Sequence, residues 1–238
     1  MKNAVIIGAN SDIAKGMMPM LEDDGYSLQT WRHEDDDDDI YTFVPEAWDL
    51  FICFVGTVGP VGRWTQWNTM GIKGSWTKSI HSNLITPFEM LVRAWPNHVP
   101  GAAVCFFAGS NPNMIMPGYS AYNVGKMALL KLVEQLDYET PDAKFFALGP
   151  GIVLTKIHQA TLDADWHNPK LREALIAGKS NPIRDIYDCM QWCISQPKEV
   201  VGGRNICVSD WHPRKKGALL LRYRLRENPD LFKLRRVE

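Results

Sequence analysis

Short runs of continuously apolar residues, each closed by small residues, constrain the fold of this chain most strongly. The three clearest runs span Ala4 to Ile7, Asp49 to Val55 and Ala102 to Phe107, and glycine follows each within two residues. A run of this length suits a parallel β-strand that is buried on both faces. Because parallel strands need long crossover connections, we expect helices between them.

The rest of the chain supplies those connections. Ile13, Met17 and Leu21 recur at helical spacing, and helical periodicity returns in 80–95, 122–136 and 183–194. Further strands are predicted at 26–31, 144–148 and 205–208. Neither a repeat nor a linker divides residues 1–238. The sequence therefore predicts the α/β class, as a single Rossmann-type domain with a doubly wound, mostly parallel sheet and helices on both faces.

Three segments depart from this alternation. Only about 17 residues separate the second strand from Asp49, which leaves room for a loop and a short strand near Ile40 to Phe43 but not for two crossover helices. Residues 158–181 lack a clear period and are interpreted as a mobile substrate lid. The basic tail, 215–238, also holds Leu219, Leu220, Leu221, Tyr223, Leu225, Leu231 and Phe232, so we expect it to pack against a neighbouring subunit rather than to bind nucleic acid.

The composition of the chain limits the classes of partner and the cellular compartment that we expect for it. The chain has 26 Lys plus Arg and 27 Asp plus Glu, so its net charge of -1 predicts neither a nucleic acid nor a membrane as partner. The acidic run Glu34 to Asp39 is interpreted as a solvated loop. No apolar stretch approaches a membrane span. The five cysteines fit no disulfide framework, and Cys189 and Cys193 lack further ligands for a metal, so we expect buried thiols, no metal and a cytoplasmic protein.

The first strand is followed at once by a turn of small residues, Gly8-Ala9-Asn10-Ser11-Asp12-Ile13-Ala14. This turn leads into a helix, whose free N-H groups and dipole favour an anion. Strand, turn and helix in this order are typical of a site for a dinucleotide pyrophosphate. A full three-glycine fingerprint would have glycine near Asp12 and Ala14, so an ordinary strand-to-helix turn remains the alternative.

Tyr122 and Lys126 stand four residues apart and therefore share one face of the predicted helix. A phenol has a pKa of about 10, and a nearby ammonium favours the phenolate. The pair is thus a candidate general acid/base. The alternative is an ordinary helix with one buried ring and one solvated cation.

These landmarks, taken in order, resemble the short-chain dehydrogenase/reductase family over nearly the whole chain. The turn at Gly8 is similar to the family's cofactor turn, and the strand that ends in Gly56 is similar to its central strand. Asn83 with Pro87, Ala108-Gly109-Ser110, Tyr122 with Lys126, and Pro150-Gly151-Ile152-Val153-Leu154-Thr155 follow the family's remaining motifs. The resemblance implies cofactor contacts from Gly8, Asn10, Ser11, Asp12, Ile13, Phe54, Val55, Gly56, Tyr122, Lys126, Pro150, Gly151, Val153 and Thr155.

The resemblance also implies roles and an activity. The protein would be an NAD(P)-dependent oxidoreductase that moves a hydride between a nicotinamide and a carbonyl or alcohol carbon. Tyr122 would transfer the proton, and Lys126 would lower the pKa of Tyr122 and hold the nicotinamide ribose. Ser110 would bond the substrate oxygen, and Asn83 would hold a water that feeds Lys126. Family members commonly form homodimers or homotetramers through the helices that carry Asn83 and Lys126.

Departures from the family pattern leave alternatives open. Cys53-Phe54-Val55-Gly56 lacks the family's two asparagines, Asp12 replaces a glycine, and the spacing from Ser110 to Tyr122 is about one residue short. The altered turn and the lost asparagines motivate a second hypothesis, a non-catalytic or regulatory dinucleotide-binding protein, whereas the short spacing puts the register of Ser110 in question. The short link after the second strand resembles that of dihydropteridine reductase, which makes a pterin-type reductase a narrower enzymatic alternative.

The residues that end the second strand bear on cofactor choice. An NAD-selective site usually has a carboxylate there, whereas this chain has Thr30, Trp31 and Arg32. A guanidinium can bind a 2′-phosphate, and a flat Trp31 or Arg32 side chain could cover the adenine. NADP(H) is therefore favoured over NAD(H), although the acids from Glu34 onward argue against it. Substrate contacts are expected from Trp64, Trp67, Met114, Met116 and the lid.

Overall fold

In the computed structural model, residues 2–32, 42–65, 76–110, 114–211 and 217–235 are described. Six strands form one sheet in the order β2-β1-β3-β4-β5-β6, and every pairing is parallel. The strands are β1 Lys2–Ile7, β2 Tyr26–Trp31, β3 Trp48–Cys53, β4 His98–Phe107, β5 Lys144–Gly149 and β6 Asn205–Cys207. The predicted α/β class and parallel sheet are therefore confirmed.

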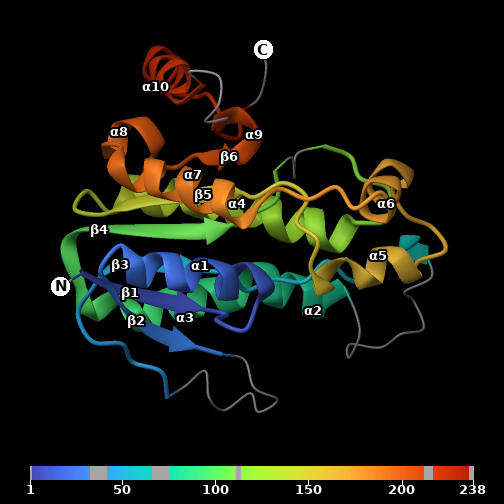
Figure 1. Cartoon of the computed structure of the whole chain (residues 1–238), viewed down its shortest axis with the longest axis horizontal. Helices are drawn as coiled ribbons and strands as arrows, with labels where there is room; N and C mark the ends of the chain where they lie inside the picture. The colour runs from blue at the N-terminus through green and yellow to red at the C-terminus, as the bar shows by residue number, and fades with distance from the viewer. Residues whose placement is uncertain (1, 33–41, 66–75, 111–113, 212–216, 236–238) are drawn as a thin grey trace.

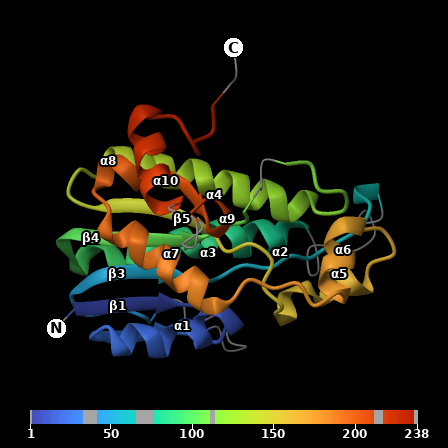
Figure 2. The same ribbon diagram turned by 45° about the horizontal axis from the view of Figure 1, so that its top comes forward.

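Side chains of each strand alternate between two cores. In β1, Ala4 and Ile6 belong to one buried cluster, while Val5 and Ile7 belong to the other, as the two-residue period of a strand requires. The first core is closed by α1 Asp12–Asp23 and α7 Ile183–Ser195, and the second by α3 Thr86–Ala94 and α4 Ser120–Glu139. Figures 1 and 2 show these helices on the two faces of the sheet.

The direction of strand order reverses at β1, because β2 lies on one side of it and β3 on the other. In sheets of this kind ligands bind outside the carboxyl ends of the strands at such a switch point. β2 and β3 are joined without a crossover helix among the described residues. The short strand expected near Ile40 to Phe43 is absent at Thr42 and Phe43, and Ile40 and Tyr41 lie outside the described residues, as does the acidic run from Glu34 to Asp39.

The helical segment before β4 is longer and less regular than its periodicity predicts. It runs from α2 Trp76–Ile80 through a π-helical turn, η4 His81–Ile85, into α3 and the short η5 Trp95–Asn97. Pro87 cannot supply the N-H that an α-helix would direct at the Asn83 carbonyl. Wide turns of this kind often occur at functional sites. This one places the side chain of Asn83 in the interior, where it is fully buried.

The segment 158–181 has more regular structure than expected. η6 Lys156–His158, α5 Gln159–Asp163 and α6 Pro169–Ile176 follow β5. The Tyr119 hydroxyl donates to Thr161 Oγ1 at 2.7 Å, and the Asn181 N-H donates to the Ile152 carbonyl at 2.7 Å. These contacts fix the segment at the carboxyl ends of the strands, beyond the arrowheads in Figure 1. Its mobility as a lid stays a prediction.

The C-terminal segment packs mainly on its own chain. Beyond α8 Lys198–Val201 and α9 Val208–Trp211, α10 Gly217–Glu227 buries Leu221 and Leu225 in the first core, against which Leu231 and Phe232 also pack. Buried Arg204 donates to the carbonyls of Leu225, Asn228 and Pro229. The expectation that the whole tail packs on another subunit is therefore wrong for these four apolar residues, because the first core extends to α10. Leu219, Leu220 and Tyr223 are exposed.

The five cysteines are all buried free thiols, as expected. Among the described residues, no helix combines the length and the apolar character needed to cross a membrane.

Candidate functional site

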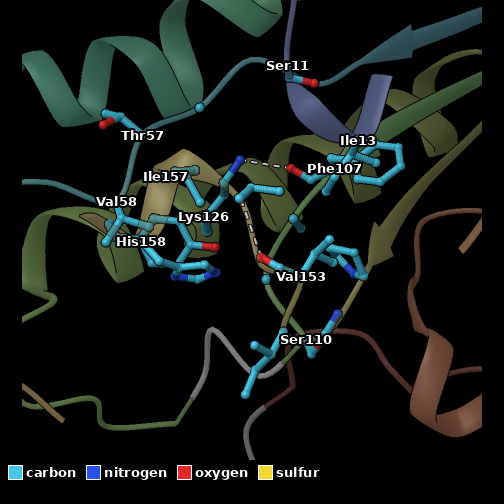
Figure 3. A pocket seen from close by; sticks show the side chains of 18 of the residues that line it. Ser11, Ile13, Thr57, Val58, Phe107, Ser110, Lys126, Val153, Ile157 and His158 are labelled. Atoms are coloured by element: carbon cyan, nitrogen blue, oxygen red, sulfur yellow. Dashed lines mark hydrogen bonds between the residues drawn. The ribbon is translucent and has the colours of Figure 1, made fainter. Parts of the chain in front are cut away.

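A cavity of about 510 Å³ opens at the carboxyl ends of the central strands, next to the switch point. Figure 3 shows Lys126 near its centre, with Ile13 and Phe107 on one side and Val58 and His158 on the other. The predicted residues that line it are Ser11, Asp12, Ile13, Phe54, Gly56, Ser110, Tyr122, Lys126, Pro150, Gly151, Val153 and Thr155. The fold therefore brings most of the predicted site into one cavity.

Gly8 shapes the turn that enters the cavity from β1. Its φ is +81°, and a Cβ there would lie 3.1 Å from Val55 Cγ2 and 3.2 Å from the Val55 nitrogen. Glycine is thus required both by the backbone conformation and by the close approach of the loop that follows β3. Ser11 caps α1 by accepting a hydrogen bond from the Ala14 N-H at 3.1 Å. The turn and helix N-terminus expected for an anion site are present.

Asp12 is one of the residues that line the cavity. Its Oδ2 accepts a hydrogen bond from the Lys156 backbone N-H at 3.1 Å, which joins the start of α1 to the loop after β5. A carboxylate in the first turn stabilises the helix dipole. The same charge opposes an anionic ligand at this helix N-terminus.

Asn83 lies behind the cavity wall and meets Gly56 and Lys126, which line the cavity. Asn83 Nδ2 donates to the Thr57 carbonyl at 2.8 Å, and Asn83 Oδ1 accepts from the Thr57 N-H at 3.3 Å. A Cβ on Gly56 would lie 2.7 Å from Asn83 Oδ1 and 3.0 Å from Lys126 Nζ. Asn83 therefore holds the loop after β3, and only a residue without a side chain fits between it and Lys126. The water proposed for Asn83 stays a prediction.

The pKa values of Tyr122 and Lys126 follow burial more than mutual attraction. Burial raises the pKa of Tyr122 to about 12, because the phenolate would lose its hydration. Burial lowers the pKa of Lys126 to about 8, and its Nζ donates to the Phe107 carbonyl at 2.8 Å. The pKa of Tyr122 is therefore raised rather than lowered in this structure, because desolvation of the phenol dominates, and a lowering contribution from Lys126 stays a prediction.

Ser110 lines the cavity at the end of the loop that follows β4. Its Oγ accepts a hydrogen bond from the Gly151 N-H at 2.7 Å, and its carbonyl accepts from the Cys207 thiol at 2.9 Å. These bonds tie the serine to the loops after β5 and β6. The side chain is therefore held beside Pro150-Gly151 despite the short spacing to Tyr122.

Other predicted site residues do not line the cavity, namely the cofactor residues Gly8, Asn10, Arg32 and Val55 and the catalytic residue Asn83. Arg32 is exposed just beyond β2. Trp31 is only 4% exposed and packs in the second core, so its predicted stacking on an adenine is wrong. The Trp31 ring contributes to the stability of the core, and a ring buried there cannot stack on a ligand at the surface.

The substrate side also differs from the prediction. Met116 lines the cavity, whereas Trp64 and Met114 are exposed outside its lining, and Trp67 lies outside the described residues. The expected lid contributes His158 and Leu171 to the lining, whereas sequence reasoning missed Tyr119 and Asn123. Only their position beside Tyr122 could have indicated these two residues.

Comparisons with known proteins bear on the fold. No protein-family model and no curated protein matches this sequence. Among solved structures, a ligand-free aldohexose dehydrogenase from Thermoplasma acidophilum has a TM-score of 0.69 and 14% identity, over 87% of this chain and 92% of that chain. A short-chain dehydrogenase/reductase from Brucella melitensis, described as a glucose/ribitol dehydrogenase, has a TM-score of 0.69 and 16% identity, over 87% and 94%.

A third similar structure is BdcA in complex with NADPH, with a TM-score of 0.68 and 16% identity, over 87% of this chain and 92% of that chain. Identities this low show a shared fold and nothing finer. The resemblance seen in the motifs is therefore confirmed as a likeness of fold: this chain has the architecture of short-chain dehydrogenases/reductases.

Proposed function

We propose that this chain, which has the short-chain dehydrogenase/reductase fold, is an NAD(P)-dependent oxidoreductase acting on a carbonyl or alcohol substrate. The observation that carries the proposal is a single cavity that reaches from the N-terminal turn of α1 to Ser110, Tyr122 and Lys126. A dinucleotide site and a proton donor thus share one space. Such convergence of polar groups in a cavity at strand ends is where ligands bind in this type of sheet.

The lining fits a nicotinamide dinucleotide in most respects. The Gly8 turn and α1 would receive the pyrophosphate, Val153 and Thr155 the nicotinamide, and Lys126 the adjoining ribose. Asp12 fits less well because its charge lies at the pyrophosphate end. When bound, the cofactor would supply the hydride that converts a carbonyl carbon to an alcohol carbon.

The protein's own contribution is the proton. With a pKa of about 12, Tyr122 keeps its proton at neutral pH and can donate it to the carbonyl oxygen as the hydride arrives. The reverse oxidation needs the phenolate, which burial disfavours. Ser110 would orient the substrate oxygen beside Tyr122. The electrostatics of the site therefore support Tyr122 as the proton donor for reduction near pH 7.

The proposed cofactor is NADP(H) rather than NAD(H). Arg32 is exposed immediately after β2, where it can meet a 2′-phosphate with charge-assisted bonds. The NADPH bound to BdcA, a protein of the same fold, is consistent with this choice. The test compares the dissociation constants for NADPH and NADH in the native protein and in Arg32→Ala. A native preference for NADH that the substitution leaves unchanged would refute the assignment.

A second candidate function rests on Asp12. A charge that opposes the pyrophosphate, together with the loss of both asparagines before Gly56, is also compatible with a regulatory protein that binds a dinucleotide without turning it over. Ser110, Tyr122 and Lys126 in one cavity favour the enzyme, because binding alone does not require all three.

The deciding experiment uses Tyr122→Phe. A thermal-shift screen first identifies the stabilising dinucleotide, and a panel of ketones and aldehydes is then followed by NADPH oxidation. We expect Tyr122→Phe to bind NADPH like the native protein but to lose at least about 100-fold in kcat, since general acid catalysis contributes about that much or more. Tyr138→Phe, on an exposed ring of the same helix, is the matched control. Native-like turnover by Tyr122→Phe would refute its role.

A further inference from the structure

Two side chains of β6 hold the loop that carries Ser110. The Ala108 N-H still bonds to β5, whereas Gly109 and Ser110 lie beyond the end of β4. Asn205 Nδ2 donates to the Gly109 carbonyl at 3.1 Å, and the Cys207 thiol donates to the Ser110 carbonyl at 2.9 Å. Two consecutive carbonyls of the loop are thus bound by one short strand.

These side chains reach the loop across β5, which lies between β4 and β6 in the sheet. Asn205 and Cys207 are two residues apart and therefore point to the same face, while Ile206 between them packs in the first core. Gly149 of β5 is paired with Cys207, and a Cβ on Gly149 would lie 2.7 Å from Cys207 Sγ and 2.8 Å from Ser110 Cα. The glycine therefore leaves the space in which the β6 side chains meet the loop.

The two donors are buried and act from a fixed strand. Asn205 is 9% exposed and Cys207 is 4% exposed, so water competes little for their hydrogen bonds. Burial and the nearby charge of Asp210 raise the pKa of Cys207 to about 12, so the thiol keeps the proton that it donates. β6 itself pairs with β5, and the Asn205 N-H donates to the Phe232 carbonyl at 3.2 Å.

The segment that β6 holds lies against two hydroxyl groups of the proposed catalytic site. Ser110 Oγ accepts from the Gly151 N-H at 2.7 Å. A Cβ on Gly109 would lie 3.2 Å from Tyr122 Oη, so the glycine backbone packs close to the phenol. A misplacement of about 1 Å can cost about 100-fold in rate, so the placement of this segment bears on turnover. The bonds from β6 fix Ser110 whatever the length of the chain between Ser110 and Tyr122.

We propose that Asn205 and Cys207 are positioning residues for Ser110: by holding the Gly109 and Ser110 carbonyls from β6, they keep Ser110 Oγ where it bonds the substrate oxygen. This inference rests on the proposed oxidoreductase function. It adds two residues that are not among those lining the described cavity. They affect the reaction through Ser110.

The kinetic test uses Asn205→Leu, Cys207→Ala and Cys207→Ser with the best carbonyl substrate of the panel. The first two variants each remove a donor and should lower kcat about fivefold or more, while the dissociation constant for NADPH stays within about twofold. Cys207→Ser keeps a donor and should retain at least about half of the native kcat. In a Ser110→Ala background, Asn205→Leu should change kcat by less than about twofold, because the side chain that it positions is gone.

Ile206→Ala is the matched control on the same strand. It truncates a side chain in the first core and should lower the melting temperature, but it removes no donor to the loop. At temperatures where the variant is folded, its kcat should stay within about twofold of the native value. An equal loss of kcat in Ile206→Ala, or an undiminished effect of Asn205→Leu in the Ser110→Ala background, would overturn the positioning role.

Hydrogen exchange at the Gly151 amide, followed by NMR, tests the same contact without turnover. This N-H bonds to Ser110 Oγ in an exposed part of the structure, so its exchange reports local opening rather than global unfolding. We expect exchange at least about fivefold faster in Asn205→Leu and in Cys207→Ala, and unchanged exchange in Ile206→Ala.

The two measurements together separate the two proposals. Faster exchange in Asn205→Leu and Cys207→Ala, with no carbonyl turned over by the native protein, would support the anchoring of Ser110 and count against the oxidoreductase. Unchanged exchange, or faster exchange with a native-like kcat, would overturn the positioning role and leave the oxidoreductase standing.

Discussion

Replacing Asp12 by Asn should tighten dinucleotide binding, even though Asp12 lies in the predicted cofactor turn. The substitution keeps the size of the side chain and an oxygen that can accept from the Lys156 N-H, now at 3.1 Å from Asp12 Oδ2. It removes the charge and replaces the second carboxylate oxygen by an NH₂ donor. Asp12→Ala removes both the charge and the contact, so the two variants separate repulsion from the loss of a hydrogen bond.

The size of the effect follows from Coulomb's law. Two like unit charges about 4 Å apart repel by about 1 kcal/mol in water, and by more where protein replaces solvent. Asp12 is half-buried at the cavity wall, and a pyrophosphate carries about two charges. A relief of about 1 to 2 kcal/mol corresponds to roughly 5- to 30-fold tighter binding. The helix would in turn lose about 0.3 to 1 kcal/mol of dipole stabilisation, so the free protein should melt slightly earlier.

The assay is the dissociation constant for NADPH, measured by titration calorimetry at low and at high salt. Asp23→Asn removes the same charge from the exposed far end of α1, about 16 Å away along the helix, and controls for net charge. Screening should shrink the gain in Asp12→Asn as salt increases. Unchanged or weaker NADPH binding in Asp12→Asn, or an equal gain in Asp23→Asn, would refute the reasoning.

Three further predictions concern charge and packing around the cavity. Because the pKa of Lys126 is about 8 and that of Tyr122 about 12, kcat/KM for reduction should fall as pH rises through about 8, where the ammonium is lost; a profile flat to pH 10 would contradict this. Gly56→Ala would place a Cβ 2.7 Å from Asn83 Oδ1, so denaturant titration should show a loss of about 1 to 3 kcal/mol, and native-like stability would be inconsistent with the packing. Arg204→Met leaves several carbonyls of the C-terminal segment without a donor, so the free energy of unfolding should fall by about 3 kcal/mol or more and hydrogen exchange in α10 should become faster. Exchange protection of α10 equal to that in the native protein would show that Arg204 does not hold the C-terminal segment.

Much of the fold could be predicted from the sequence because it depends on the pattern of neighbouring residues. The runs at Ala4 to Ile7 and Ala102 to Phe107 are apolar on both faces, and only a parallel strand covered on two sides buries them fully. The spacing of Tyr122 and Lys126 likewise fixes their common helix face. Family resemblance added the order of the motifs, and the cavity contains most of the residues that it implied.

The chain by itself therefore determined the strands, the crossover helices and the edge of the sheet where the site lies, because those features depend on neighbours in sequence. Only the tertiary structure decided that Asn83 meets Gly56 and Lys126, that Asp12 bonds to Lys156 and that His158 lines the cavity. It also decided the direction of the pKa shift of Tyr122, since desolvation depends on everything packed around the ring. Contacts between residues distant in sequence leave no local period, so the properties that depend on them appear only in the folded chain.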